Sequence, residues 1–234
     1  MTELLTMVQE RADEFNTHYA FAVSLQNGFF AGEPIGSTRL SVQHLLTMNS
    51  GLIVHLYNVV EAVMSHATKI VESAFGTVPP KAWSDNARRE WLREHGVARV
   101  EGNADTRLKQ VESFSRRLLA ERPLGSQPIR KPSGSWSDKN IGIFASRLGV
   151  NLPIQPDLYK KLAKRDSLGE RGPLAFLADR RNDLAHGRRT FEGGAKDLTL
   201  ALIREIADVA LEYMTLVATS FQAYVDQRQF MAVT

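Results

Sequence analysis

The stretch Arg180-Arg181-Asn182-Asp183-Leu184-Ala185-His186-Gly187-Arg188-Arg189 combines four arginines with an amide, a carboxylate and a histidine. It continues an apolar run in which leucines recur at helical spacing, so we expect a helix over residues 174–186. Pro173 suits the first turn of this helix, and Gly187 allows the chain to leave it. The stretch therefore predicts a helix with polar and charged side chains at its C-terminal end.

Apolar stripes at three- and four-residue spacing predict further helices on both sides of this stretch. We expect long helices over residues 2–26, 40–75 and 195–227, and short helices over residues 86–95, 105–121 and 138–148. No stretch alternates apolar and polar residues as a half-buried strand does. The sequence therefore predicts an all-α fold with three long helices and several short ones.

Two of these helices carry expectations about their ends and faces. Asn27-Gly28 is typical of a helix C-terminus and is expected to close the first helix. In the helix over residues 105–121, the apolar side chains are expected to face inward and the basic ones outward. The apolar side chains are Leu108, Val111, Leu118 and Leu119.

Residues 122–139 contain three prolines and are expected to be the least structured part of the chain. Arg130, Lys131 and Trp136 allow two interpretations of this loop. It is either a surface connection, or a basic segment that holds a nucleic-acid backbone while the tryptophan stacks on a base.

Charge is unevenly distributed along the chain. Residues 1–87 have a net charge of −4, residues 88–131 of +5 and residues 132–234 of +2. A basic middle segment suits a nucleic-acid or phosphate partner. On charge alone, a solvated charged surface remains the favoured interpretation.

Composition excludes disulfides and thiolate metal sites, because the chain has no cysteine. We therefore expect a reducing, cytoplasmic location. The N-terminus has no basic segment before an apolar core, so no signal peptide is expected. No apolar run approaches the roughly 18 residues of a membrane span, so no membrane partner is expected.

The spacing of the opening stretch suggests how its side chains are arranged. Arg181 falls in the apolar stripe between Leu177 and Leu184, where a guanidinium needs a carboxylate, a phosphate or an interface. Asn182 and His186 are four residues apart and share a neighbouring face. The histidine lies at a helix C-terminus, where the dipole favours its protonated form. From the residues alone, ion pairing, capping and acid–base chemistry all remain open.

The segment from Arg181 to Gly187 resembles the Arg-x4–6-His signature of the HEPN superfamily, including the polar residue after its arginine. Three surrounding features agree with that resemblance: the leucine-bearing helix before the motif, the glycine-rich turn after Phe191 and the long last helix. The segment from Ser137 to Leu148 also resembles a branch of the superfamily that is encoded near toxin–antitoxin and restriction loci. The resemblance implies a single HEPN-like domain over residues 1–234. This is a helical bundle with long antiparallel helices and a basic insertion at about 82–136.

The resemblance further implies a homodimeric, metal-independent endoribonuclease that needs no cofactor. Arg181 and His186 would be catalytic, with two copies of each meeting across a two-fold interface. Asn182 and Asp183 would orient them. Arg180, Arg188 and Arg189 would position RNA phosphates.

One position departs from part of the superfamily. Some HEPN toxins carry a modifiable tyrosine two residues after the histidine, and here that position is Arg188. We therefore expect a different antitoxin, another cognate protein or an internal control to restrain the activity. Two alternatives stay open: a non-catalytic module that binds RNA or a nucleotide, and a structural subunit of a helical dimer.

Overall fold

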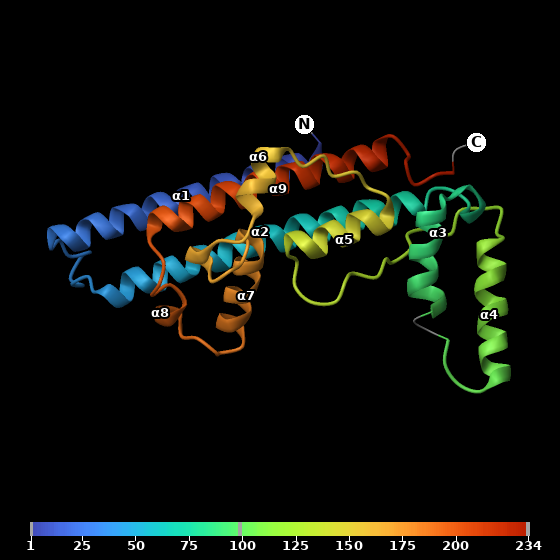
Figure 1. Ribbon diagram of the computed structural model, residues 1–234, viewed down its shortest axis with the longest axis horizontal. Helices are drawn as coiled ribbons and strands as arrows, with labels where there is room; N and C mark the ends of the chain where they lie inside the picture. The colour runs from blue at the N-terminus through green and yellow to red at the C-terminus, as the bar shows by residue number, and fades with distance from the viewer. Residues whose placement is uncertain (1, 98–99, 233–234) are drawn as a thin grey trace. The chain divides into compact units, whose positions relative to one another are not determined.

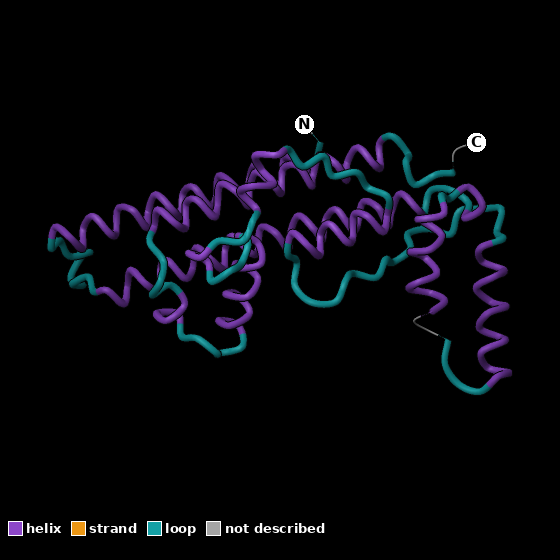
Figure 2. The backbone as a smooth tube through the Cα atoms, in the orientation of Figure 1, coloured by secondary structure: helices purple, strands orange, loops and turns teal. Residues whose placement is uncertain are grey.

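The computed structural model describes residues 2–97 and 100–232. Residues 98 and 99 of the expected insertion, and residues 1, 233 and 234 of the expected domain, lie outside the described residues. Among those described, helices connected by loops make up the whole fold and no strand forms (Figures 1 and 2). The chain is therefore all-α, as the periodicity predicts.

Nine α-helices follow one another in the described ranges. They are α1 (Glu3–Ala31), α2 (Val42–Phe75), α3 (Asp85–Leu92), α4 (Ala104–Leu118), α5 (Asp138–Leu148), α6 (Pro156–Leu162), α7 (Pro173–Ala185), α8 (Phe191–Gly194) and α9 (Leu200–Asp226). Short 3-10 turns cover Pro80–Ala82 and Asp166–Leu168, and a π turn covers Arg93–Val97. None of the helices in the described ranges combines the length and the apolar character that a membrane span requires.

The chain folds into two compact units. Unit 1 comprises Met1–Val63, Ser135–Asp138 and Ile154–Leu216, and unit 2 comprises Met64–Gly134, Lys139–Pro153 and Val217–Thr234. The candidate site lies in unit 1.

Unit 1 is organised around α1 and the parts of α2 and α9 that belong to it. The Phe15 ring of α1 lies 6.1 Å from the His55 ring of α2, and Tyr19 donates a hydrogen bond of 3.1 Å to the carbonyl of Leu200. The core consists of side chains at helical spacing that are almost fully buried, and burial of such side chains contributes roughly 1.5–3 kcal/mol each. They include Leu4, Val8, Phe15, Leu52, Ile53, Leu56, Ile203, Ile206 and Met214.

Unit 2 is centred on aromatic side chains. The ring of Trp83 lies 5.7 Å from Phe75 and 6.2 Å from Trp91, and all three side chains are buried. Both indole N–H groups have acceptors: Trp83 donates to the Phe75 carbonyl at 3.0 Å and Trp91 to the Gln127 side chain at 3.0 Å. This satisfies the polar atoms that burial of tryptophan brings into a core.

The end of the first helix differs from the expectation. α1 continues through Asn27-Gly28 and ends at Ala31, because Gly32 adopts the left-handed conformation with φ 74° and its N–H bonds the carbonyl of Phe29 at 3.1 Å. A glycine inside a helix costs only about 1 kcal/mol relative to alanine. Gly28 is tolerated there, and the termination signal lies four residues later.

The face of α4 also differs from the expectation. The predicted helix forms, with the Asn103 side chain accepting from the Thr106 N–H at 2.9 Å as its N-cap. None of its residues is buried, however, and Leu108 and Leu119 are 67% and 77% exposed. Periodicity predicts that one side of a helix is apolar, but it does not say whether another element covers that side.

Candidate functional site

Helix α7 ends in a Schellman arrangement that places the histidine at the helix terminus. Gly187 has φ 67°, its N–H bonds the Leu184 carbonyl at 3.2 Å, and the Arg188 N–H bonds the Asp183 carbonyl at 2.8 Å. His186 is the C-cap residue. The expected roles of Pro173 in the first turn and of Gly187 beyond the last turn are both confirmed.

Arg180 has a structural role that the sequence did not predict. Its side chain is buried, donates to both carboxylate oxygens of Asp197 at 2.7 and 2.8 Å, and donates to the Gly194 carbonyl at 2.5 Å. The Phe176 ring lies 4.7 Å from its guanidinium carbon. This corrects the expectation that Arg180 positions an RNA phosphate, because its guanidinium is enclosed and already bonded.

The same geometry corrects the assignment of the apolar stripe. Neighbouring helical residues are rotated by about 100°, so Arg180 and Arg181 flank the line from Leu177 to Leu184 on opposite sides. Spacing alone does not decide which of the two is buried. The acceptors at Gly194 and Asp197 decide it, and Arg180 is the arginine that joins the buried face.

Arg181 is partly buried and is held by two residues of α2. Its Nη2 donates to the Glu61 carboxylate, and its guanidinium carbon lies 4.4 Å from the centroid of the Tyr57 ring. Its Nε is buried and, like its Nη1, has no hydrogen-bond partner among the residues that the structure describes. The arginine is therefore oriented by the fold while keeping donors that are not engaged.

Asn182 connects the motif to the segment before α5. Its amide donates to the Ser135 hydroxyl at 2.7 Å, and Ser135 also hydrogen-bonds the Tyr57 phenol. The Trp136 backbone N–H donates to that phenol oxygen at 2.9 Å. Burial raises the pKa of Tyr57, with the Ser135 and Trp136 hydrogen bonds opposing it, so this group stays a neutral phenol. Asn182 thus helps to orient Ser135 and, through it, the Tyr57 ring beside Arg181.

Asp183, Arg188 and Arg189 form a loose group at the end of α7. The Asp183 carboxylate lies 3.4 Å from Arg188 Nη1 and 3.4 Å from Arg189 Nε, and both arginines are exposed. Exposed pairs of this length contribute little to stability and are easily exchanged for another anion. These two arginines have the accessibility that a phosphate-binding role requires.

The His186 side chain is exposed and makes no hydrogen bond, ion pair or ring contact with any residue in the described ranges. Arg181 contacts Tyr57 and Asn182 contacts Ser135, and these two contacted residues are hydrogen-bonded to each other. His186, in contrast, lies at the end of the helix. No cluster of three or more His, Asp or Glu side chains with a geometry suited to a metal ion occurs in residues 2–97 and 100–232.

Trp136 is not available to stack on a base, which corrects one interpretation of the loop over residues 122–139. Its side chain is only 7% exposed. Other residues of this stretch are also buried, including Gln127 and Ile129, and the Ile129 N–H donates to the Glu72 carboxylate at 2.9 Å. Residues 122–137 lack helix, but Gln127, Ile129 and Trp136 within them are buried and hydrogen-bonded.

Four residues of the site were not predicted from the sequence: Tyr57, Glu61, Ser135 and Asp197. Tyr57 and Glu61 are one helical turn apart on α2. A carboxylate on a mostly apolar helix is a sequence feature that could have pointed to a partner for Arg181. Ser135 and Asp197 lie in connecting segments without periodicity. Only the tertiary fold brings them to α7.

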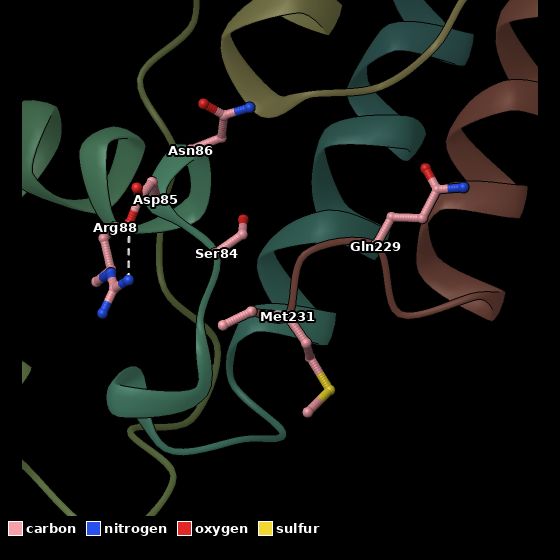
Figure 3. A pocket seen from close by; sticks show the side chains of 7 residues that line it. Ser84, Asp85, Asn86, Arg88, Gln229 and Met231 are labelled. Carbon is pink, nitrogen blue, oxygen red and sulfur yellow. Dashed lines mark hydrogen bonds and ion pairs between the residues drawn. The ribbon is translucent and has the colours of Figure 1, made fainter. Parts of the chain in front are cut away.

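Unit 2 has a pocket of about 360 Å3 that involves none of the motif residues. Figure 3 shows Ser84, Asp85, Asn86 and Arg88 at the start of α3, together with Gln229 and Met231 from the end of the chain. Arg88 and Asp85 pair with each other at 2.7 Å, and Ser84 caps α3 by accepting from the Ala87 N–H. The Ser84, Asp85 and Arg88 side chains of this pocket therefore serve the start of α3.

Comparison with known proteins assigns the chain to a family. A family model, HEPN_MAE_28990 (MAE_28990-like HEPN), matches residues 1–230. Neither the comparison with curated proteins nor that with solved structures gives a match. The matched range includes the Arg-x4-His motif on α7 and all nine α-helices of the described residues. The chain therefore belongs to the HEPN_MAE_28990 family of the HEPN superfamily.

Proposed function

We propose that this protein is an endoribonuclease of the toxin or defence type, with its site at a homodimer interface. HEPN membership and the complete Arg-x4-His motif on α7 support the proposal. The observation that carries it is the contrast between the two motif residues. Arg181 is held rigidly by α2, while His186 is exposed with no competing partner in the described chain.

The proposed reaction begins with attack by a ribose 2′-hydroxyl on the adjacent phosphorus. His186 takes the proton of that hydroxyl as a general base. The P–O5′ bond breaks, and the partner subunit's His186 donates a proton to the leaving 5′ oxygen. The products are a 2′,3′-cyclic phosphate and a 5′-hydroxyl. The chain's own side chains carry both proton transfers, so the proposed step needs no metal ion.

Arg181 stabilises the charge that develops on the non-bridging phosphoryl oxygens. Preorganised cationic donors are effective in this role because they need not reorganise during the reaction. Its Nη1 has no partner in the described chain, so at least one guanidinium nitrogen is free to donate to the phosphate. Asp183 and Asn182 keep their proposed orienting role, with Asn182 acting through Ser135.

Arg188 and Arg189 position the flanking phosphates. Both side chains are exposed beside His186 in sequence and are only loosely paired to Asp183. Contacts of this kind set register on the backbone without reading bases. In the cell, we propose that an antitoxin or another cognate protein restrains cleavage.

One observation favours a second candidate, a binding module without turnover. Arg181 is already ion-paired with Glu61, and an arginine with that role binds an anion less strongly than a free one. Under this alternative, RNA binds with a salt-dependent affinity and is released without being cleaved.

Incubation of purified protein with single-stranded RNA in EDTA separates the two candidates. The proposal predicts fragments that end in a 2′,3′-cyclic phosphate, and no cleavage of the same sequence with 2′-deoxyribose throughout. Binding without fragments favours the module. Cleavage of the deoxyribose version contradicts the proposed chemistry, because it removes the nucleophile.

A further inference from the structure

Glu61 and Tyr57 hold the motif arginine in two different ways. The guanidinium stacks over the Tyr57 ring, with 4.4 Å between its central carbon and the ring centroid, and its Nη2 donates to the Glu61 carboxylate. The ring limits tilt of the guanidinium plane, and the carboxylate limits rotation within that plane. Together they define one orientation of Arg181.

The two α2 residues are themselves well placed. Tyr57 is fully buried, and its phenol oxygen is fixed by the Trp136 N–H at 2.9 Å. Glu61 follows one turn later on the same helix. The Arg181 side chain is thus constrained by a rigid helix and not by a loop.

Exposure indicates what the ion pair does. The Glu61 side chain is 42% exposed and that of Arg181 is 23% exposed. Ion pairs with this much solvent contribute little to folding stability. Such a pair still fixes the direction of the Arg181 guanidinium, because it selects one of the many rotamers of this long side chain. Among the described residues, the Arg181 Nη1 has no partner and is the donor left for a ligand, whereas Nε is buried without a partner.

We infer that Glu61 is a positioning residue that aims the Arg181 guanidinium at the scissile phosphate. This inference rests on the proposed ribonuclease function and deepens it. Glu61 acts through Arg181, so its removal affects the phosphate step and not the fold. A misplaced catalytic group typically reduces a rate by up to about 100-fold.

The test combines four variants with the intact chain: Glu61→Ala, Glu61→Gln, Arg181→Ala and the double variant Glu61→Ala/Arg181→Ala. Glu212→Ala is the matched control, because Glu212 is 47% exposed and pairs with Lys161 at 2.8 Å. The readouts are the single-turnover cleavage rate, the Kd for an oligonucleotide with 2′-deoxyribose at the cleavage sites, and Tm.

The inference predicts that Glu61→Ala slows single-turnover cleavage about 10- to 100-fold with little change in Tm. Glu61→Gln keeps an acceptor oxygen and recovers much of the rate. In the Arg181→Ala background, Glu61→Ala causes no further loss of cleavage rate, because Glu61 acts only through Arg181. Glu212→Ala cleaves like the wild type.

Equal rates for the wild type and Glu61→Ala overturn the positioning role while leaving the ribonuclease function intact. A Glu61→Ala effect of the same size with and without Arg181 also overturns it. A wild type that does not cleave contradicts the proposed function instead. The Kd values then decide the positioning role: a Glu61→Ala effect that disappears without Arg181 supports it, and unchanged Kd values overturn it.

Discussion

Arg180 and Asp197 are joined by two parallel hydrogen bonds of 2.7 and 2.8 Å between the guanidinium and the carboxylate. The arginine is 5% exposed, whereas the Asp197 side chain is 58% exposed. The hydrogen bonds from Arg180 lower the pKa of Asp197, and partial burial opposes that shift. The pair ties α7 to the segment that precedes α9, and so fixes the helix that carries the motif.

Substitution Asp197→Ala is expected to destabilise the protein. It leaves a buried guanidinium with the Gly194 carbonyl and the Phe176 ring as its remaining partners, and an uncompensated buried charge costs about 3 kcal/mol. Denaturant unfolding measures the change. The control on α7 is Asp179→Ala, which breaks an exposed pair with Arg171, a residue before the helix, and is expected to cost under about 1 kcal/mol. Equal effects of the two substitutions would contradict the structural role of Arg180.

Two glycines are expected to respond to alanine with opposite signs. Gly187 has φ 67°, so alanine there is strained by about 1 kcal/mol although no atom lies near its Cβ position. Gly51 lies inside α2 with open space around its Cβ position, and alanine there is expected to stabilise the fold by about 1 kcal/mol. Thermal unfolding of both variants gives the comparison. Stabilisation by Gly187→Ala would show that the Schellman end of α7 is wrong.

Stability is expected to fall as pH drops below about 6.5, the ordinary value for histidine. Burial lowers the pKa of His55, Glu14 opposes that shift, and nearby His18 adds to it. The unfolded chain therefore binds a proton at His55 more readily than the folded protein does. The stability that depends on neutral His55 is complete above pH 6.5 and is lost as the pH falls below that value. Tm measured from pH 7.5 to 5.5 should decline less steeply for His55→Leu than for the wild type. Identical slopes would rule out His55 as the source.

Much of the helical plan could be predicted from the sequence. Helix α5 has the predicted bounds and buries Ile141, Phe144, Ala145 and Leu148, the four residues expected to face inward. Its predictability follows from local signals that agree with one another. The single-domain boundary over residues 1–234 and the insertion at about 82–136 stay predictions.

The remaining features depended on partners distant in sequence. Glu61 and Arg181 are 120 residues apart, and no local pattern connects them. Trp136 was expected in the least structured part of the chain, but its side chain is buried and its backbone N–H donates to the Tyr57 phenol oxygen at 2.9 Å. The choice between Arg180 and Arg181 as the buried arginine was likewise made by Asp197. Periodicity locates helix faces, and tertiary contacts decide how they are used.

The single-turnover cleavage rate of RNA in EDTA, measured for the wild type and His186→Ala, tests directly whether His186 is catalytic. The His186 side chain is exposed and makes no hydrogen bond, ion pair or ring contact in the described chain, so its replacement should leave Tm unchanged. We expect His186→Ala to lose roughly 100- to 10,000-fold in rate, the range for one acid–base group. Equal cleavage by the two proteins would contradict the catalytic assignment of His186.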